Sequence, residues 1–338
     1  MRTITLEEHY VSQAFLELAG ADLGPQQAVD MSAAAVTDLG ELRLNDMDAA
    51  GIDMQVLSHV LPTFDAIPVD RQVAIATRAN DQAAEACEAN PDRFAAFAAL
   101  PMGDPPAAAR ELDRAVSELC FKGALINGRE GGRFLDDPEL LPVLERAAAL
   151  RVPLYLHPGL PSDSIRREYY SGLPSEVAYA LAAPAWGWHA ETGLHLLRLI
   201  ATGTFDRLPG LQIIVGHMGE MLPFMLDRVD AYLTPPARRN GLQRSIAETF
   251  RSNVWVTTSG MFSTGPLRLL IDVIGIDRVL FSVDYPFCAT TQGRDFLHHL
   301  PISTADKAKI SHRNAEKLLD IPPTPGSSHH PRRGEIPS

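Results

Sequence analysis

Short β-prone runs alternate with helical stretches along almost the whole chain, and this alternation constrains the fold more than any other feature. The runs lie at residues 1–10, 54–59, 94–100, 123–127, 152–157, 212–217, 254–260 and 279–284. Helical patterns lie at 41–50, 70–89, 104–119, 137–150, 188–201, 218–233, 266–274 and 304–319. Alternating strands and helices indicate a parallel α/β fold, and eight units point to a closed (β/α)8 TIM barrel.

The main competitor is an open, doubly wound sheet. No G-x-G-x-x-G follows the first run, which weakens a dinucleotide-binding interpretation. We therefore expect one barrel domain over residues 1–320, with long insertions after strand one (10–39) and strand five (159–185). Residues 321–338 are rich in Pro, Ser, His and Arg, and we expect a flexible tail there.

The amino-acid composition limits which molecules the protein can bind and where it can be located. The formal net charge of −12 argues against nucleic acid or an anionic membrane surface, since both need a basic protein face. The three cysteines are scattered, so neither a disulfide framework nor a thiolate metal site is indicated. The chain enters a strand at once, without a leader, and has no apolar run of about 18 residues. We expect a cytoplasmic protein.

Ionisable side chains recur where the predicted strands end. In a barrel these strand ends surround one axis, and the active site of a barrel enzyme lies at this end. A lone histidine at such a place is usually a hydrogen-bonding or packing residue, but the joint pattern favours a divalent metal site built from imidazole and carboxylate, which suits Zn²⁺ or Mn²⁺. Strand alternation places Glu7 and His9 on one face and Glu8 on the other. The strand ends carry Glu7, His9, His59, His157, His217, Ser259 and Asp284.

Several motifs, in order, give the chain a specific resemblance from Leu6 to about Leu319. It resembles the amidohydrolase-related superfamily, in particular its metal-dependent aromatic acid decarboxylases, such as those acting on 2,6- and 2,3-dihydroxybenzoate and 5-carboxyvanillate, with aminocarboxymuconate semialdehyde decarboxylase more distant. The motifs are Leu6-Glu7-Glu8-His9, Tyr155-Leu156-His157-Pro158, Glu191-Thr192-Gly193, the block from Ile213 to Glu220, Thr258-Ser259-Gly260, and the block from Phe281 to Phe287.

The resemblance implies a ligand set and a mechanism. Glu7, His9, His157 and Asp284 would bind one divalent metal, Zn²⁺ with Mn²⁺ as the alternative. Asp284 would also protonate the substrate ring, with His217 and Glu220 beside it as further catalytic residues.

Hydrolytic relatives usually carry His-x-His on strand one and a lysine at the end of strand four. Here strand one carries Glu-x-His, and strand four ends at Asn127, with Lys122 ahead of the strand. One metal and a carboxy-lyase reaction on a hydroxybenzoate-type acid are therefore favoured. The alternatives are a metal-dependent hydrolase, such as a lactonase or amidohydrolase, and a barrel that only binds.

The substrate pocket is less defined. Phe287 and the tyrosines after His157 could stack on an aromatic ring or simply pack, and Arg228 could contact the substrate anion or form a surface salt bridge. Gly159 stands where dihydroxybenzoate relatives commonly have arginine, and Met261 where they often have a polar residue. Relatives form dimers or tetramers, so a homodimer or homotetramer is expected, with Trp186 and Trp188 in an interface or in the core.

Overall fold

Eight parallel strands form the centre of the molecule. The computed structural model describes residues 1–19, 33–60 and 67–323. The strands are β1 (Ile4–Tyr10), β2 (Met54–His59), β3 (Phe94–Ala96), β4 (Ala124–Asn127), β5 (Leu154–His157), β6 (Ile213–Val215), β7 (Val254–Thr257) and β8 (Val279–Leu280). They pair in chain order, β1 to β3 in one sheet and β4 to β8 in a second.

Two further contacts join these sheets into a ring. A parallel bridge links Ala98, just after β3, to Ala124 on β4. A second parallel bridge links Glu8 on β1 to Tyr285, just after β8, and the His9 amide donates to the Tyr285 carbonyl at 2.7 Å. Each strand thus has a neighbour on both sides, which confirms the predicted (β/α)8 barrel.

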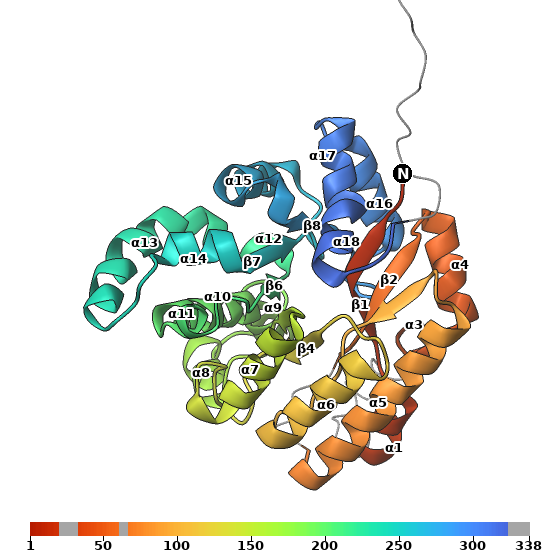
Figure 1. The fold of residues 1–338 in the computed structure, drawn as a ribbon, viewed down its shortest axis with the longest axis horizontal. Coiled ribbons are helices and arrows are strands. Elements are labelled where there is room, and N and C mark those ends of the chain that lie inside the picture. Colours follow the sequence, from red (N-terminus) through yellow and green to blue (C-terminus); the bar gives the residue numbers. More distant parts are fainter. Residues whose placement is uncertain (20–32, 61–66, 324–338) are drawn as a thin grey trace, which may run out of the picture.

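Helices surround the ring of strands (Figure 1). The first half carries α1 (Gln13–Ala19), α3 (Ala34–Thr37), α4 (Glu41–Ala50), α5 (Val69–Ala89), α6 (Pro105–Ser117), α7 (Leu141–Leu150), α8 (Asp163–Tyr169) and α9 (Ser175–Ala182). The second half carries α10 (Gly187–Ala201), α11 (Thr204–Arg207), α12 (His217–Glu220), α13 (Leu222–Arg239), α14 (Ile246–Asn253), α15 (Thr264–Ile274), α16 (Thr290–His299), α17 (Thr304–Ala308) and α18 (Asn314–Leu319). Short 3₁₀ turns cover Pro138–Leu140 and Ile276–Arg278, and a π-helical segment, Lys309–Arg313, joins α17 to α18.

The lower part of the barrel is a filled apolar core. Inward side chains from all eight strand positions form one buried cluster, which includes Leu6, Phe97, Tyr155 and Trp255. Ala315, Leu319 and Ile321 belong to the same cluster, so the chain after β8 closes this end. Functional groups are therefore confined to the opposite end, where the strands finish.

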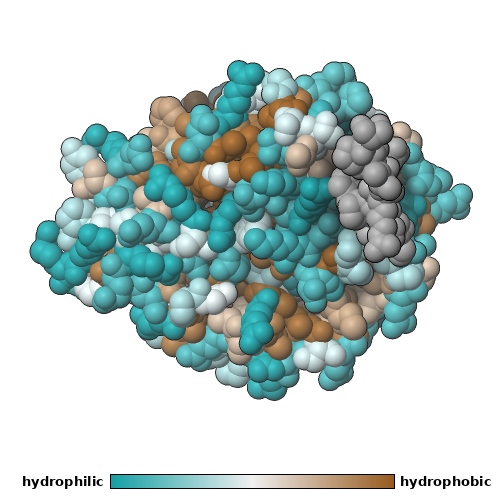
Figure 2. Space-filling model, turned by 45° about the horizontal axis from the view of Figure 1, so that its top comes forward, coloured by the Kyte–Doolittle hydropathy of each residue, from teal (hydrophilic) through white to brown (hydrophobic). Residues whose placement is uncertain are grey.

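A second apolar layer lies between the strands and the helices. It is a large cluster of buried residues to which the helices contribute mainly alanine, leucine and isoleucine. The face of the molecule shown in Figure 2 is mostly hydrophilic, with apolar residues gathered in a few patches. No helix in the described part of the chain is both long and apolar enough to cross a membrane.

The helix predictions differ from the structure at several places. The helices α14 and α16 were missed, because short segments such as Ile246–Asn253 carry few repeats of the helical period. The helix predicted from residue 218 begins at Leu222 and continues through Pro235 and Pro236 to Arg239. Proline has a fixed φ that suits a helix, and α13 is held by packing on α14, which offsets the lost hydrogen bonds.

The predicted insertions contain structure of their own. The first carries α1 and α3, and the second carries α8 and α9. Residues 20–32 of the first insertion and 324–338 of the predicted tail lie outside the described residues. The start of the tail is packed, since Ile321 is buried and the Pro322 carbonyl accepts a hydrogen bond from Arg2.

Candidate active site

Strand β1 brings two ligand-type side chains to the open end of the barrel. Its register against β2 shifts between Thr5 and Glu8, an irregularity of the kind that a β-bulge produces. Leu6 belongs to the interior cluster and the next residue, Glu7, also contacts the interior residue Tyr155. The shift thus lets β1 change from filling the core to presenting Glu7 and His9 above it.

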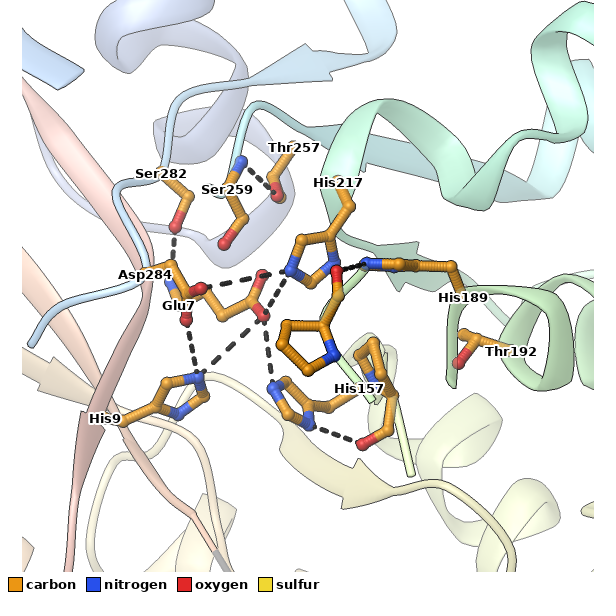
Figure 3. Close-up of polar contacts among 12 residues, drawn as sticks. Glu7, His9, His157, His189, Thr192, His217, Thr257, Ser259, Ser282 and Asp284 are labelled. Atoms are coloured by element: carbon orange, nitrogen blue, oxygen red, sulfur yellow. Dashed lines mark hydrogen bonds and ion pairs between the residues drawn. The ribbon is translucent and has the colours of Figure 1, made fainter. Parts of the chain in front are cut away.

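Glu7 lies at the centre of the polar contacts (Figure 3). Its Oε2 accepts a hydrogen bond from the Tyr155 hydroxyl below it. Its Oε1 lies 3.3 Å from His157 Nε2, 3.8 Å from His9 Nε2 and 4.0 Å from His217 Nε2. One oxygen is therefore anchored in the core, while the other faces three imidazoles.

The ring nitrogens of His9 and His157 are oriented by their outer partners. His157 Nδ1 lies 2.9 Å from the Pro158 carbonyl, which can only accept, so the proton is on Nδ1 and Nε2 offers a lone pair to the site. His9 Nδ1 lies 3.1 Å from Ser58 Oγ, which leaves its Nε2 facing Asp284 and Glu7. Both rings thus present Nε2 to one point, as metal-binding histidines do.

Asp284 completes the group from the segment after β8. Its Oδ1 lies 3.2 Å from His9 Nε2 and its Oδ2 lies 4.0 Å from His217 Nε2. Its backbone φ of 77° is in the left-handed region. The buried Glu8 carboxylate braces this segment by accepting from the Val283 and Tyr285 amides at 3.0 and 3.3 Å. Glu8 is thus a buried structural group on the face opposite Glu7.

His217 comes from an unusual turn after β6. Residues 217 to 221 all have positive φ, from 49° at His217 to 89° at Gly219. Each non-glycine residue in this region costs about 1–2 kcal/mol, so surrounding contacts must hold the turn. Glu220 Oε1 accepts from His217 Nδ1 at 2.9 Å. The two side chains thus contact each other, but the right-handed helix predicted from residue 218 does not begin here.

The electrostatics of the cluster favour positive charge. Burial alone would lower the pKa of His9, but the nearby carboxylates of Asp284 and Glu7 raise it to about 9. Burial likewise opposes the charge on His217, yet Glu220 and Glu7 raise its pKa to about 10. Burial raises the pKa of Glu7, but the charges of the surrounding imidazoles outweigh it and hold the pKa well below its usual range. The carboxylates of Glu7, Asp284 and Glu220 thus favour positive charge in this cluster.

A divalent cation fits the same point. Glu7 Oε1 and His9 Nε2 are fully buried, and within the described ranges neither forms a hydrogen bond. Such atoms are costly to bury unless something binds them. One ligand atom each from Glu7, His9 and His157 lies within 4.8 Å of the others. These oxygen and nitrogen donors are the types that Zn²⁺ and Mn²⁺ accept.

The other predicted residues lie around this cluster or away from it. Phe287 is half exposed, with its ring centroid 5.7 Å from that of His9, at the edge of the site. His59 turns away, and its Nε2 accepts from the Ser12 amide at 2.9 Å. Arg228 is exposed on α13, where its guanidinium stacks on Tyr232. Lys122 bonds the Asp320 carbonyl, away from the strand-four end at Asn127.

Sequence reasoning missed three supporting side chains. Tyr155 lies two residues before His157 on one strand, so the period-2 rule could have found it. Ser58, the partner of His9, is one residue before the predicted strand end at His59. His189, on α10, lies 2.6 Å from Glu220 through its Nδ1. A helix residue carries no strand-end signal, so nothing in the pattern pointed to it.

Known proteins resemble this chain over nearly its whole length. The amidohydrolase family profile matches residues 29–321. A γ-resorcylate decarboxylase from Rhizobium sp. (strain MTP-10005) is 41% identical over 94% of this chain and 98% of that protein. A crystal structure of 2,6-dihydroxybenzoate decarboxylase with 2,6-dihydroxybenzoate is 39% identical, with a TM-score of 0.84 over 95% of this chain and all of that one.

One further structure reports a metal. It is the dihydroxybenzoic acid decarboxylase from Polaromonas sp. JS666 with bound manganese and the inhibitor 2-nitroresorcinol, which is 38% identical with a TM-score of 0.84, covering 94% of this chain and 97% of that one. The predicted resemblance is thus confirmed by sequence and by structure. The chain belongs to the amidohydrolase family, in its branch of metal-dependent aromatic acid decarboxylases.

Proposed function

We propose that this chain is a metal-dependent carboxy-lyase that releases CO2 from a hydroxybenzoate-type acid without an oxidant. The proposal is supported by the donor cluster of Glu7, His9 and His157, with Asp284 beside it. Strand β4 ends at Asn127, so no lysine is offered there for a second metal. Relatives named as decarboxylases of dihydroxylated benzoic acids support the same reaction.

We propose Glu7, His9, His157 and Asp284 as the metal ligands, through the buried atoms that face one another. A bound divalent ion supplies a template and a Lewis acid for the substrate carboxylate and its ortho hydroxyl. Manganese in the Polaromonas relative supports Mn²⁺. Zn²⁺, which accepts the same donors, is the alternative, and elemental analysis of the purified protein distinguishes them.

Asp284 is the proposed acid. Burial and the charge of Glu7 raise its pKa above the usual range, although the nearby imidazole of His9 acts against this. The proton from Asp284 forms the new C–H bond on the ring carbon that bears the carboxylate. The C–C bond to the carboxylate then breaks, its electron pair restores the aromatic ring, and CO2 leaves. One proton from water restores Asp284 in each cycle.

We propose Phe287 and Arg228 as substrate-binding residues, and the position of Phe287 supports its role better than the position of Arg228 does. The Phe287 ring lies beside His9, where it can stack on a bound aromatic ring. Arg228 is exposed, and its role in binding the substrate anion stays a prediction, as does a homodimer or homotetramer. The half-exposed Trp186 side chain supports an interface at α10, which light scattering of the purified protein would test.

The test is turnover of a panel of hydroxybenzoates by metal-loaded protein, with CO2 release and ring absorbance as readouts. We expect turnover of acids with an ortho hydroxyl and none of 4-hydroxybenzoate, because only the former can chelate. Asp284→Asn should abolish turnover. His157→Ala should lose bound metal; if elemental analysis finds full metal content in it, the proposed ligand set is wrong. Lactone hydrolysis without CO2 release would favour the hydrolase alternative instead.

A further inference from the structure

Glu220 has two imidazole partners. Its Oε1 lies 2.9 Å from His217 Nδ1, and its Oε2 lies 2.6 Å from His189 Nδ1. The carboxylate is 2% exposed, so water does not compete strongly for it. The two rings lie edge to face, with centroids 4.6 Å apart. His189 lies on the far side of His217 from Glu7 (Figure 3).

His189 is itself held on its outer side. Since a carboxylate only accepts, Nδ1 carries the proton that bonds Glu220. The other nitrogen, Nε2, lies 2.9 Å from the Pro184 carbonyl and 3.1 Å from Trp188 Nε1. It can therefore donate to the first or accept from the second. Either way the ring is anchored between the segment before α10 and the buried Glu220.

The turn that carries His217 has a strained backbone and must be held by contacts with other elements. Its backbone is left-handed from His217 to Met221, which costs free energy at each non-glycine residue. Helix α10 approaches this turn closely at Gly193: a Cβ on this residue would lie 3.0 Å from the Glu220 carbonyl oxygen. Gly193 therefore allows the helix to contact the turn backbone, and His189 on the same helix binds the turn's only carboxylate.

We propose that His189 is a positioning residue for the decarboxylation, acting through Glu220 on His217. By occupying Oε2 it fixes the plane of the Glu220 carboxylate, and Oε1 then fixes the His217 ring. His217 Nε2 consequently faces the space between Glu7 Oε1 and Asp284 Oδ2, at 4.0 Å from each. This inference rests on the proposed function, because the process that His217 assists is the proposed one.

The test compares three variants of the metal-loaded, full-length protein. His189→Leu removes the donor to Glu220, whereas His189→Asn keeps an N–H near the position of Nδ1. His298→Asn, on the exposed end of α16, is the matched control. We expect His189→Leu to keep one metal per chain and a KM within about threefold, while kcat falls roughly 10- to 100-fold, as for other outer partners of ligand groups. His189→Asn should recover most of kcat.

A spectroscopic readout separates positioning from general stability. The His217 Nδ1 proton, bonded to a carboxylate, should give a downfield NMR signal that shifts in His189→Leu and returns in His189→Asn. Wild-type kcat in His189→Leu, or equal losses in both variants accompanied by loss of metal, would overturn the proposal. If the wild-type protein decarboxylates nothing, the proposed function fails, and an unshifted His217 signal in His189→Leu would separately refute the positioning role.

Discussion

Tyr155 binds one oxygen of Glu7 and leaves the other oxygen facing the proposed metal site. Its hydroxyl donates to Oε2 and also lies 3.0 Å from Thr257 Oγ1. We expect Tyr155→Phe to keep the fold, since the ring shape is unchanged, and to weaken metal binding roughly 10- to 100-fold. Metal titration with a fluorescent competitor measures this. Tyr179→Phe, on an exposed side chain, is the control, and equal affinities in both variants would contradict the role given to Tyr155.

Gly216 leaves the space that Glu7 occupies. A Cβ at this position would lie 2.7 Å from Glu7 Oε2 and 3.1 Å from the Tyr155 hydroxyl. Gly216→Ala should therefore displace the Glu7 carboxylate and lower metal content, which elemental analysis measures. Gly210→Ala meets no atom within 4 Å and serves as the control. Full metal content in Gly216→Ala would show that metal binding does not depend on the position of the Glu7 carboxylate beside Gly216.

Most of the ligand-type residues could be predicted from the sequence, but the contacts that hold their side chains in place could not. The period of two in a strand correctly places Glu7 with His9, and the ends of parallel strands bring His157, His217 and Asp284 to the same place. The register shift in β1 and the His189–Glu220 contact depend on tertiary packing. No local pattern encodes either of them, and His59 shows that a strand-end histidine can turn away.

At the scale of elements, the left-handed turn after β6 is the most constrained segment near the site. Gly219 has φ of 89°, and a Cβ there would lie 2.8 Å from Pro223. We expect Gly219→Ala to cost about 2–5 kcal/mol of unfolding free energy, from backbone strain plus overpacking. Urea denaturation measures the cost.

The matched control for this turn is Gly203→Ala. Gly203 also has positive φ, 71°, but its nearest neighbour for a Cβ is Asp206 at 3.8 Å. It should cost only the strain, about 1–2 kcal/mol. Equal losses in the two variants would mean that packing against Pro223 contributes nothing to the turn.

The strands were easier to predict than the helices and turns. Each of the eight strands was expected, because buried parallel strands are short apolar runs bounded by turn residues. The turn at residues 217–221 was read as the start of a helix, since residue types alone do not reveal the sign of φ outside glycine and asparagine. Helix α13 continues through Pro235 and Pro236 while packing on α14, a tertiary contact that no local sequence pattern encodes.

At the scale of the whole molecule, buried neutral histidines make stability depend on pH. His195 is 1% exposed, and its Nε2 accepts from the Leu135 amide at 2.7 Å. Burial, together with the charges of Arg129 and Arg198, lowers its pKa from 6.5 to about 3. Below about pH 6.5 the unfolded chain therefore binds a proton at His195, whereas the folded chain binds it only below about pH 3. The free energy of unfolding consequently falls as the pH falls from about 6.5 to about 3.

His195→Gln tests this linkage. Glutamine can accept from the Leu135 amide but does not titrate, so the variant should lose stability less steeply between pH 6 and 4. The difference in slope should approach about 1.4 kcal/mol per pH unit, the value for one proton. Urea denaturation at several pH values measures it, with His298→Gln as the exposed control. Parallel slopes in wild type and His195→Gln would refute the assignment.

In the proposed reaction, the barrel replaces a ring carboxylate with a proton at one metal site. Turnover of 2,6-dihydroxybenzoate in D2O, with the product examined by NMR and the CO2 quantified, tests this exchange directly. We predict one CO2 per product and one deuterium on the ring carbon that lost the carboxylate, with no reaction in metal-free protein. Release of no CO2 while the same preparation hydrolyses lactones, or a product without deuterium at that carbon, would contradict it.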